Sequence, residues 1–169
     1  MKKVCCLLLV LCMMLPVFAL AEEAVKIGQV DYAAHGTKCF AVLTVAVQGD
    51  KIVAAYIDEF QFMDAATAQG VPNSTEGFGE SFPEGKVLAS KRVNAELYSA
   101  NMAKAGSTVA LDVNYAAIEE FVTGKTIAEL EAAIEGKTAE EMVDAVSGCT
   151  LVDTLGYLTG LLEAAKSVQ

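Results

Sequence analysis

The sequence predicts an α+β fold in which an antiparallel β-sheet packs with several helices. Two β-rich runs within residues 38–60 are separated by a glycine-containing turn, and from Leu88 onward most segments have apolar residues at helical spacing. Strands and helices therefore occur in mixed order rather than in strict alternation, which is typical of α+β domains. The 169 residues, 54% of them hydrophobic, suffice for one domain with its own core.

Residues 1–21 have the pattern of a secretory signal peptide. Two lysines precede an apolar run that ends in Ala-Leu-Ala, so we expect cleavage before Glu22. Pro16 also favours cleavage, and the alternative is an uncleaved anchor, since the apolar run is long enough to span a bilayer. The sequence thus predicts one domain, residues 22–169, that is secreted or lies on the extracytoplasmic face of the membrane.

The composition excludes several function classes. With 12 Lys+Arg against 22 Asp+Glu, the net charge of −10 offers no positive field for a nucleic-acid backbone. The single histidine, His35, lies in a polar segment, where we expect a solvated loop residue, and no four-ligand metal site is expected. No serine or cysteine has a local signature that pairs it with this histidine, and no glycine-rich βα fingerprint indicates a nicotinamide site.

The first elements form a predicted hairpin. Residues 38–47 and 51–60 are β-rich, and residues 48–50 (Gln-Gly-Asp) form the short loop between them. Residues 61–85 are rich in glycine and proline and are predicted to be a long connection. Connections of that length in compact domains are usually functional or mobile.

The first helix is predicted over residues 94–104, with Gly106 as its C-terminal stop, and a short β-like stretch over residues 107–113 follows. Asn114 is predicted to cap a second helix over residues 115–122.

Two further helix starts have matching signatures. Thr126 with Glu129, and Thr138 with Glu141, fit the capping box, in which a hydroxyl and a carboxylate bond each other's backbone amides. The last helix is predicted over residues 151–166, which have a stripe of apolar residues.

The stretch 144–150, Asp-Ala-Val-Ser-Gly-Cys-Thr, is the most informative for function. It places a small, flexible Ser147-Gly148 pair before Thr150, which we expect at the N-cap of the last helix. Free backbone amides and the helix dipole favour an anionic phosphate there. Asp144 is placed to bind a cation or to hydrogen-bond the loop. The simpler alternative is that Thr150 only caps a helix.

This stretch resembles the Asp-x-x-(Ser/Thr)-Gly-Ala-Thr motif of FMN-binding domains related to the FMN-carrying components of the sodium-translocating NADH:quinone reductase and of Rnf complexes. The match covers Asp144, Ser147, Gly148 and Thr150, and Cys149 stands where the family usually has alanine. Most of the chain beyond the signal peptide also looks like small secreted FMN-binding proteins of Gram-positive bacteria.

The resemblance implies that Thr150 carries FMN through a phosphodiester bond. A separate magnesium-dependent flavin transferase makes this bond in the family, using FAD. Asp144 would be the family's acidic residue, and Ser147, Gly148 and Cys149 would form the loop that the flavin phosphate approaches. The protein would then be an exported electron carrier between membrane redox proteins and extracellular acceptors, rather than a complete enzyme. The alternative is a secreted non-redox ligand-binding or interaction module.

Several other residues have two open interpretations. Cys39 and Cys149, which remain after processing, either form a disulfide or are two buried thiols. Lys91 and Arg92 either contact a flavin phosphate or ribityl chain or solvate a helix start, and solvation is favoured. Five aromatic side chains are candidates for a platform under the flavin ring, with core packing as the default. These are Phe60, Phe62, Phe78, Phe82 and Tyr157.

Overall fold

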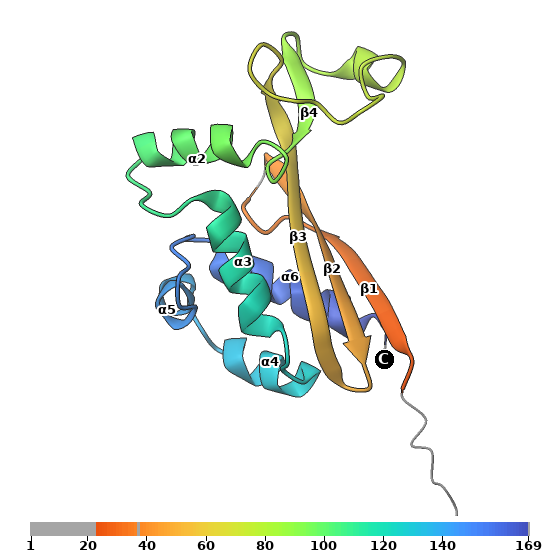
Figure 1. Ribbon diagram of the computed structural model, residues 1–169, viewed down its shortest axis with the longest axis vertical. Coiled ribbons are helices and arrows are strands. Elements are labelled where there is room, and N and C mark those ends of the chain that lie inside the picture. Colours follow the sequence, from red (N-terminus) through yellow and green to blue (C-terminus); the bar gives the residue numbers. More distant parts are fainter. Residues whose placement is uncertain (1–22, 37, 169) are drawn as a thin grey trace, which may run out of the picture.

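The computed structural model describes residues 23–36 and 38–168, so the predicted signal peptide, residues 1–21, lies outside the described part. Within that part, four antiparallel strands form one sheet in the order β1-β2-β3-β4, which confirms the predicted α+β fold (Figure 1). The strands are β1 (Val25–Tyr32), β2 (Cys39–Gln48), β3 (Lys51–Asp64) and β4 (Lys86–Ser90).

The predicted hairpin is confirmed in β2 and β3. Gln48 pairs with Lys51, so the turn contains only Gly49 and Asp50. Gly49 has a φ of 63°, a left-handed conformation that glycine adopts without steric cost. β3 continues to Asp64, and the predicted long connection is therefore shorter than expected.

The two outer strands differ from the prediction. β1 was not predicted, and β4 lies where the helical pattern was expected to begin. β4 pairs with β3 between Phe60↔Ser90 and Asp64↔Lys86, and Ala89 is completely buried. Pairing with a neighbouring strand therefore decides the conformation of this segment, and its own pattern is too short to indicate it.

The described part of the chain contains five α-helices, of which α3 and α6 pack directly against the sheet (Figure 1). They are α2 (Ala95–Lys104), α3 (Leu111–Val122), α4 (Ile127–Ile134), α5 (Ala139–Ala145) and α6 (Thr154–Lys166), and a short 3₁₀ helix, η1 (Phe78–Ser81), lies in the β3–β4 connection. α6 packs against β1 and β2, and α3 packs against β3. None of these helices combines the length and apolarity needed to cross a membrane.

Two glycines allow α6 to approach the sheet closely. A Cβ atom on Gly28 of β1 would lie 2.0 Å from the carbonyl oxygen of Ala164 in α6. A Cβ atom on Gly160 of α6 would lie 2.2 Å from Cδ1 of Leu43 in β2. At the far end of the same contact, the Lys26 ammonium donates to the carbonyl oxygen of Val168 at 2.9 Å, which joins the two ends of the domain.

The helix starts were predicted with mixed success. Both capping boxes, at Thr126 and at Thr138, are present with both of their hydrogen bonds, as predicted. The predicted β-like stretch over residues 107–113 is wrong, because α3 begins at Leu111, whose side chain is buried in the core. Asn114 is therefore inside α3 and does not cap it.

Candidate functional site

The motif of residues 144–150 connects α5 to α6. Asp144 lies in α5, and its side chain is outside the described part of the structure. Ser147 and Gly148 form an exposed turn, and Gly148 has a φ of 84°. Cys149 is buried and Thr150 is exposed. The predicted order of helix, small flexible turn and exposed threonine is therefore present.

The predicted N-cap position of Thr150 is wrong. α6 begins at Thr154, and Asp153 occupies the N-cap. Residues 151–154 form a separate turn, in which the buried Thr154 hydroxyl donates to the carbonyl oxygen of Leu151 at 2.6 Å. Because this turn precedes the helix, the first free amides of α6 do not lie at Thr150.

A residue of α3 holds Thr150 in place. The backbone N–H of Thr150 donates to Oδ1 of Asn114 at 2.7 Å, and the Thr150 hydroxyl lies 3.4 Å from the same oxygen. The amide group of Asn114 donates to the carbonyl oxygens of Val109 and Ala110 at 3.2 Å and 2.9 Å. Asn114 is completely buried, so it fixes the motif backbone to the core while the Thr150 side chain stays accessible.

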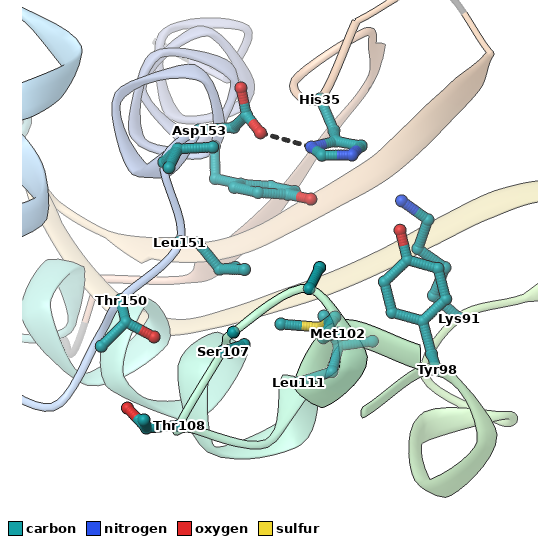
Figure 2. Close-up of a pocket in the computed structure, with 14 residues that line it drawn as sticks. His35, Lys91, Tyr98, Met102, Ser107, Thr108, Leu111, Thr150, Leu151 and Asp153 are labelled. Atoms are coloured by element: carbon teal, nitrogen blue, oxygen red, sulfur yellow. Dashed lines mark hydrogen bonds and ion pairs between the residues drawn. The ribbon is translucent and has the colours of Figure 1, made fainter. Parts of the chain in front are cut away.

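Thr150 lies on the rim of a cavity of about 430 Å³ (Figure 2). That volume is within the range of about 300–1,000 Å³ typical of small-molecule sites. The walls are mostly apolar, with Met102, Leu111 and Leu151 among them. In Figure 2, Thr150 lies on one side of this pocket and Lys91 with Tyr98 on the other, so a ligand joined to Thr150 would extend toward Lys91.

A buried ion pair lies behind the Lys91 side of the pocket. The Lys91 ammonium contacts Oε2 of Glu59, and the two side chains are 1% and 0% exposed. The Tyr157 hydroxyl, from α6, donates to the same Glu59 oxygen at 2.9 Å. The favoured prediction that Lys91 solvates a helix start is therefore wrong, because its side chain is enclosed between the sheet, α2 and α6.

The protonation states of this cluster follow from its surroundings. Burial by itself lowers the pKa of Lys91, but the Glu59 carboxylate and hydrogen bonds to Glu59 and Tyr98 outweigh it, so the pKa is raised above its ordinary value. Burial raises the pKa of Tyr157, which keeps its hydroxyl neutral and able to donate. The lysine is thus a cation on one wall of the pocket.

His35 lies at the mouth of the pocket. Its Nδ1 contacts Oδ2 of Asp153, the N-cap residue of α6, and the imidazole is 41% exposed. The prediction of an exposed loop residue is confirmed, but sequence reasoning missed its place at the site. No local pattern indicates it, since the β1–β2 connection and the α5–α6 turn are 118 residues apart.

Arg92 lies outside the pocket and is not a solvated residue of a helix start. Its guanidinium pairs with Glu119 of α3, donates to the carbonyl oxygen of Ile57 at 2.6 Å and lies 4.4 Å from the ring centroid of Tyr56. Burial raises the pKa of the Glu119 carboxyl, against the lowering effects of the Ile57 amide and Arg92. These contacts fasten α3 to β3.

Of the two open interpretations of the cysteines, the structure favours free thiols over a disulfide. Cys149 is buried, and its sulfur lies 3.1 Å from Oγ1 of Thr154; Cys39 is half-buried, and its sulfur lies 3.7 Å from the Lys91 nitrogen. In the part of the chain that the structure describes, no group of three or more histidine, cysteine or acidic side chains could hold a metal ion.

Of the five aromatic residues considered as candidates for a platform, for which core packing was the default expectation, Tyr157 alone lines the pocket beside Thr150. Phe60 stacks on Phe40, and Phe62 and Phe78 pack edge-on against Phe82. Tyr98 of α2, to which the sequence analysis assigned no role, also lines the pocket. Its ring lies 4.6 Å below the Lys91 nitrogen.

No protein family, curated protein or solved structure matches the chain. The residues present nevertheless fit a flavin tethered at Thr150. An accessible hydroxyl lies on the rim, apolar walls suit a planar ring, and a cation lies on the far side.

Proposed function

We propose that this protein is an exported electron carrier that holds FMN covalently, through a phosphodiester bond to Thr150. The observation that carries the proposal is the position of Thr150, an exposed residue that lines a mostly apolar pocket of about 430 Å³. The bound flavin would supply the redox chemistry, and the chain would supply the tether, the orientation of the ring and the electrostatic environment.

Maturation by a flavin transferase would use the Thr150 oxygen as the acceptor. That oxygen forms the new bond to phosphorus and loses its proton, the pyrophosphate bond of FAD breaks, and AMP leaves. Exposure of Thr150 favours access by the transferase, and Asn114 supports the backbone beside it at 2.7 Å. Since α6 begins at Thr154, the phosphate charge would be solvated by water and by the transferase rather than by the start of this helix.

The proposed electron flow places the protein between membrane redox proteins and extracellular acceptors. Covalent attachment suits an exported protein, because a dissociated cofactor could not be recovered outside the cell. The acidic composition, with a net charge of −10, favours partners whose contact surfaces are basic.

A non-redox ligand-binding module is the second candidate. A neighbouring cavity of about 490 Å³ shares Tyr98 and Met102 with the first pocket and extends to Phe62 and Thr67. A ligand that occupied both cavities would need no covalent bond to Thr150.

Flavin attachment separates the two functions. Residues 22–169 are co-expressed with a flavin transferase, denatured and examined for flavin fluorescence in the protein band. We expect a fluorescent band for the wild type and none for Thr150→Val. Thr108→Val is the matched control, because Thr108 lines the same pocket and is also exposed. It should remain fluorescent. A wild-type band without fluorescence would reject the carrier function and favour the ligand-binding module.

A further inference from the structure

Lys91 has an unusual position for a lysine that lines a cavity. Its backbone N–H donates to the carbonyl oxygen of Glu59 at 2.7 Å, which extends the pairing of β4 with β3 by one residue. The side chain is buried, with 1% of its surface exposed, and it lines the pocket beside Tyr98 (Figure 2). Buried lysines are rare without a paired charge, and here Glu59 provides that charge.

The ammonium has one charged hydrogen-bond acceptor, the Glu59 carboxylate. Its other neighbours are the Cys39 thiol at 3.7 Å, a weak acceptor, and Tyr98, a neutral side chain whose ring centroid lies 4.6 Å from the nitrogen, so a carbonyl oxygen of a ligand can compete with both. Oε1 of Glu59 is buried without a hydrogen-bond partner among the described residues. A cluster with unused polar atoms beside a mostly apolar cavity is suited to bind the polar edge of a largely apolar ligand.

We propose that the Lys91 ammonium binds the carbonyl-bearing pyrimidine edge of the flavin ring, an inference that rests on the proposed attachment at Thr150. Lys91 would hold this edge of the ring, and the apolar side chains of Met102, Leu111 and Leu151 would contact the rest of it. Glu59 positions the ammonium by direct contact with its Oε2 atom. Tyr157 acts through Glu59, because its hydroxyl donates to the same oxygen.

This placement has a consequence for the energetics of electron uptake. When a reduced partner supplies two electrons and solvent supplies one proton, a flavin ring gains one net negative charge, located largely on its pyrimidine edge. An enclosed ammonium at that edge stabilises the added charge, because few water molecules screen it. Lys91 is therefore expected to raise the reduction potential of the bound flavin.

The test compares reduction potentials of flavin-loaded variants. Lys91→Met alone leaves Glu59 as an unpaired buried charge, so Lys91→Met is made in a Glu59→Gln background and compared with Glu59→Gln alone. We expect the preference for reduced over oxidised flavin to be about tenfold lower in the double variant than in Glu59→Gln, which corresponds to about 30 mV for a two-electron couple. Lys91→Arg, which keeps the charge, should retain most of the wild-type potential. Lys104→Met is the matched control, because Lys104 is an exposed lysine of α2 and its loss should leave the potential unchanged.

The outcomes distinguish this inference from the function on which it rests. A wild-type protein that carries no flavin after co-expression overturns both. A loaded protein whose potential is the same in Glu59→Gln and in the folded double variant overturns only the role of Lys91. A decrease of the same size in Lys104→Met would also overturn it, because the effect would then come from net charge alone.

Discussion

Asn114, in the first turn of α3, accepts a hydrogen bond from the backbone N–H of Thr150 at 2.7 Å. The residue proposed to carry the cofactor is thus fixed to α3, although its own segment leads into α6. A buried asparagine with hydrogen bonds to the α2–α3 connection and to the motif loop connects the two walls of the pocket.

Replacing Asn114 with alanine should destabilise the fold and loosen the motif loop. The side chain is completely buried, and its removal leaves a cavity and takes the partner from the Thr150 amide. We expect a loss of about 1–3 kcal/mol in the free energy of unfolding, measured by urea denaturation, and less flavin attached per protein. Asn101→Ala, on the exposed side of α2, should change neither. An unchanged urea midpoint for Asn114→Ala would contradict the anchoring role.

The buried pair of Lys91 and Glu59 should respond differently to single and double substitution. Lys91→Met leaves the Glu59 carboxylate buried without its counter-ion, and we expect a loss of about 3–5 kcal/mol. The double variant with Glu59→Gln removes both charges and should recover most of that loss. Denaturant unfolding of the protein without flavin measures this directly. If the double variant were no more stable than Lys91→Met, the pairing would not explain the cost.

Gly28→Ala should separate α6 from the sheet. The added methyl group would lie 2.0 Å from the backbone carbonyl of Ala164, which cannot rotate away. We expect destabilisation of about 1–3 kcal/mol, read from the thermal midpoint. Gln29→Ala changes the next residue of β1, whose side chain is exposed, and should have little effect. Equal midpoints for the two variants would show that α6 does not pack this closely.

Acid should weaken the starts of α4 and α5. Hydrogen bonds from the backbone amides of Thr126 and Thr138 lower the pKa values of Glu129 and Glu141 below the ordinary 4.5. Their contribution to stability is therefore complete above about pH 4.5 and is lost as the pH falls through the lowered folded-state values. Between pH 6 and pH 3, the urea midpoint of a Glu129→Gln, Glu141→Gln variant should fall less than that of the wild type.

A weaker pH dependence of the capping-box variant could also arise because it carries fewer carboxylates, whatever their position. Glu76→Gln, which removes one exposed carboxylate outside the two capping boxes, provides the control. Its pH dependence should follow the wild type. If it flattened the profile as much as the capping-box variant, general charge repulsion would account for the effect.

The parts of the fold that could be predicted from sequence depend on local interactions. The β2–β3 hairpin needs only two β-rich runs and the turn at Gly49, and each capping box needs a threonine and a glutamate three residues apart. β1 and β4 could not be predicted in this way, because their pairing partners are supplied by the rest of the sheet. The last helix was predicted to begin at residue 151, but α6 begins at Thr154. The sequence does not show that Thr154 is buried, and this burial stabilises the separate turn at residues 151–154.

Of the candidate site, only the side formed by the 144–150 motif could be predicted from the sequence. The exposed Thr150 and the flexible Ser147-Gly148 turn follow from a short contiguous motif. The far wall combines Lys91 with Glu59, 32 residues apart, and Tyr157, 98 residues from Glu59. Charge counting favoured a solvated position for Lys91, since nothing near it in sequence shows that Glu59 is buried as its partner.

The hydrogen bond between Lys26 and the carbonyl oxygen of Val168 determines how the domain can be mounted on a surface. It brings the start of β1 and the end of α6 together at one pole of the domain. His35, which lines the pocket, follows the other end of β1, eight residues along the chain. The two poles are separated by roughly 25 Å of extended chain. A linker or surface attachment beside Lys26 or Val168 would therefore hold the domain at the pole away from His35 and leave the end with the pocket free to meet a soluble reductant or an electrode.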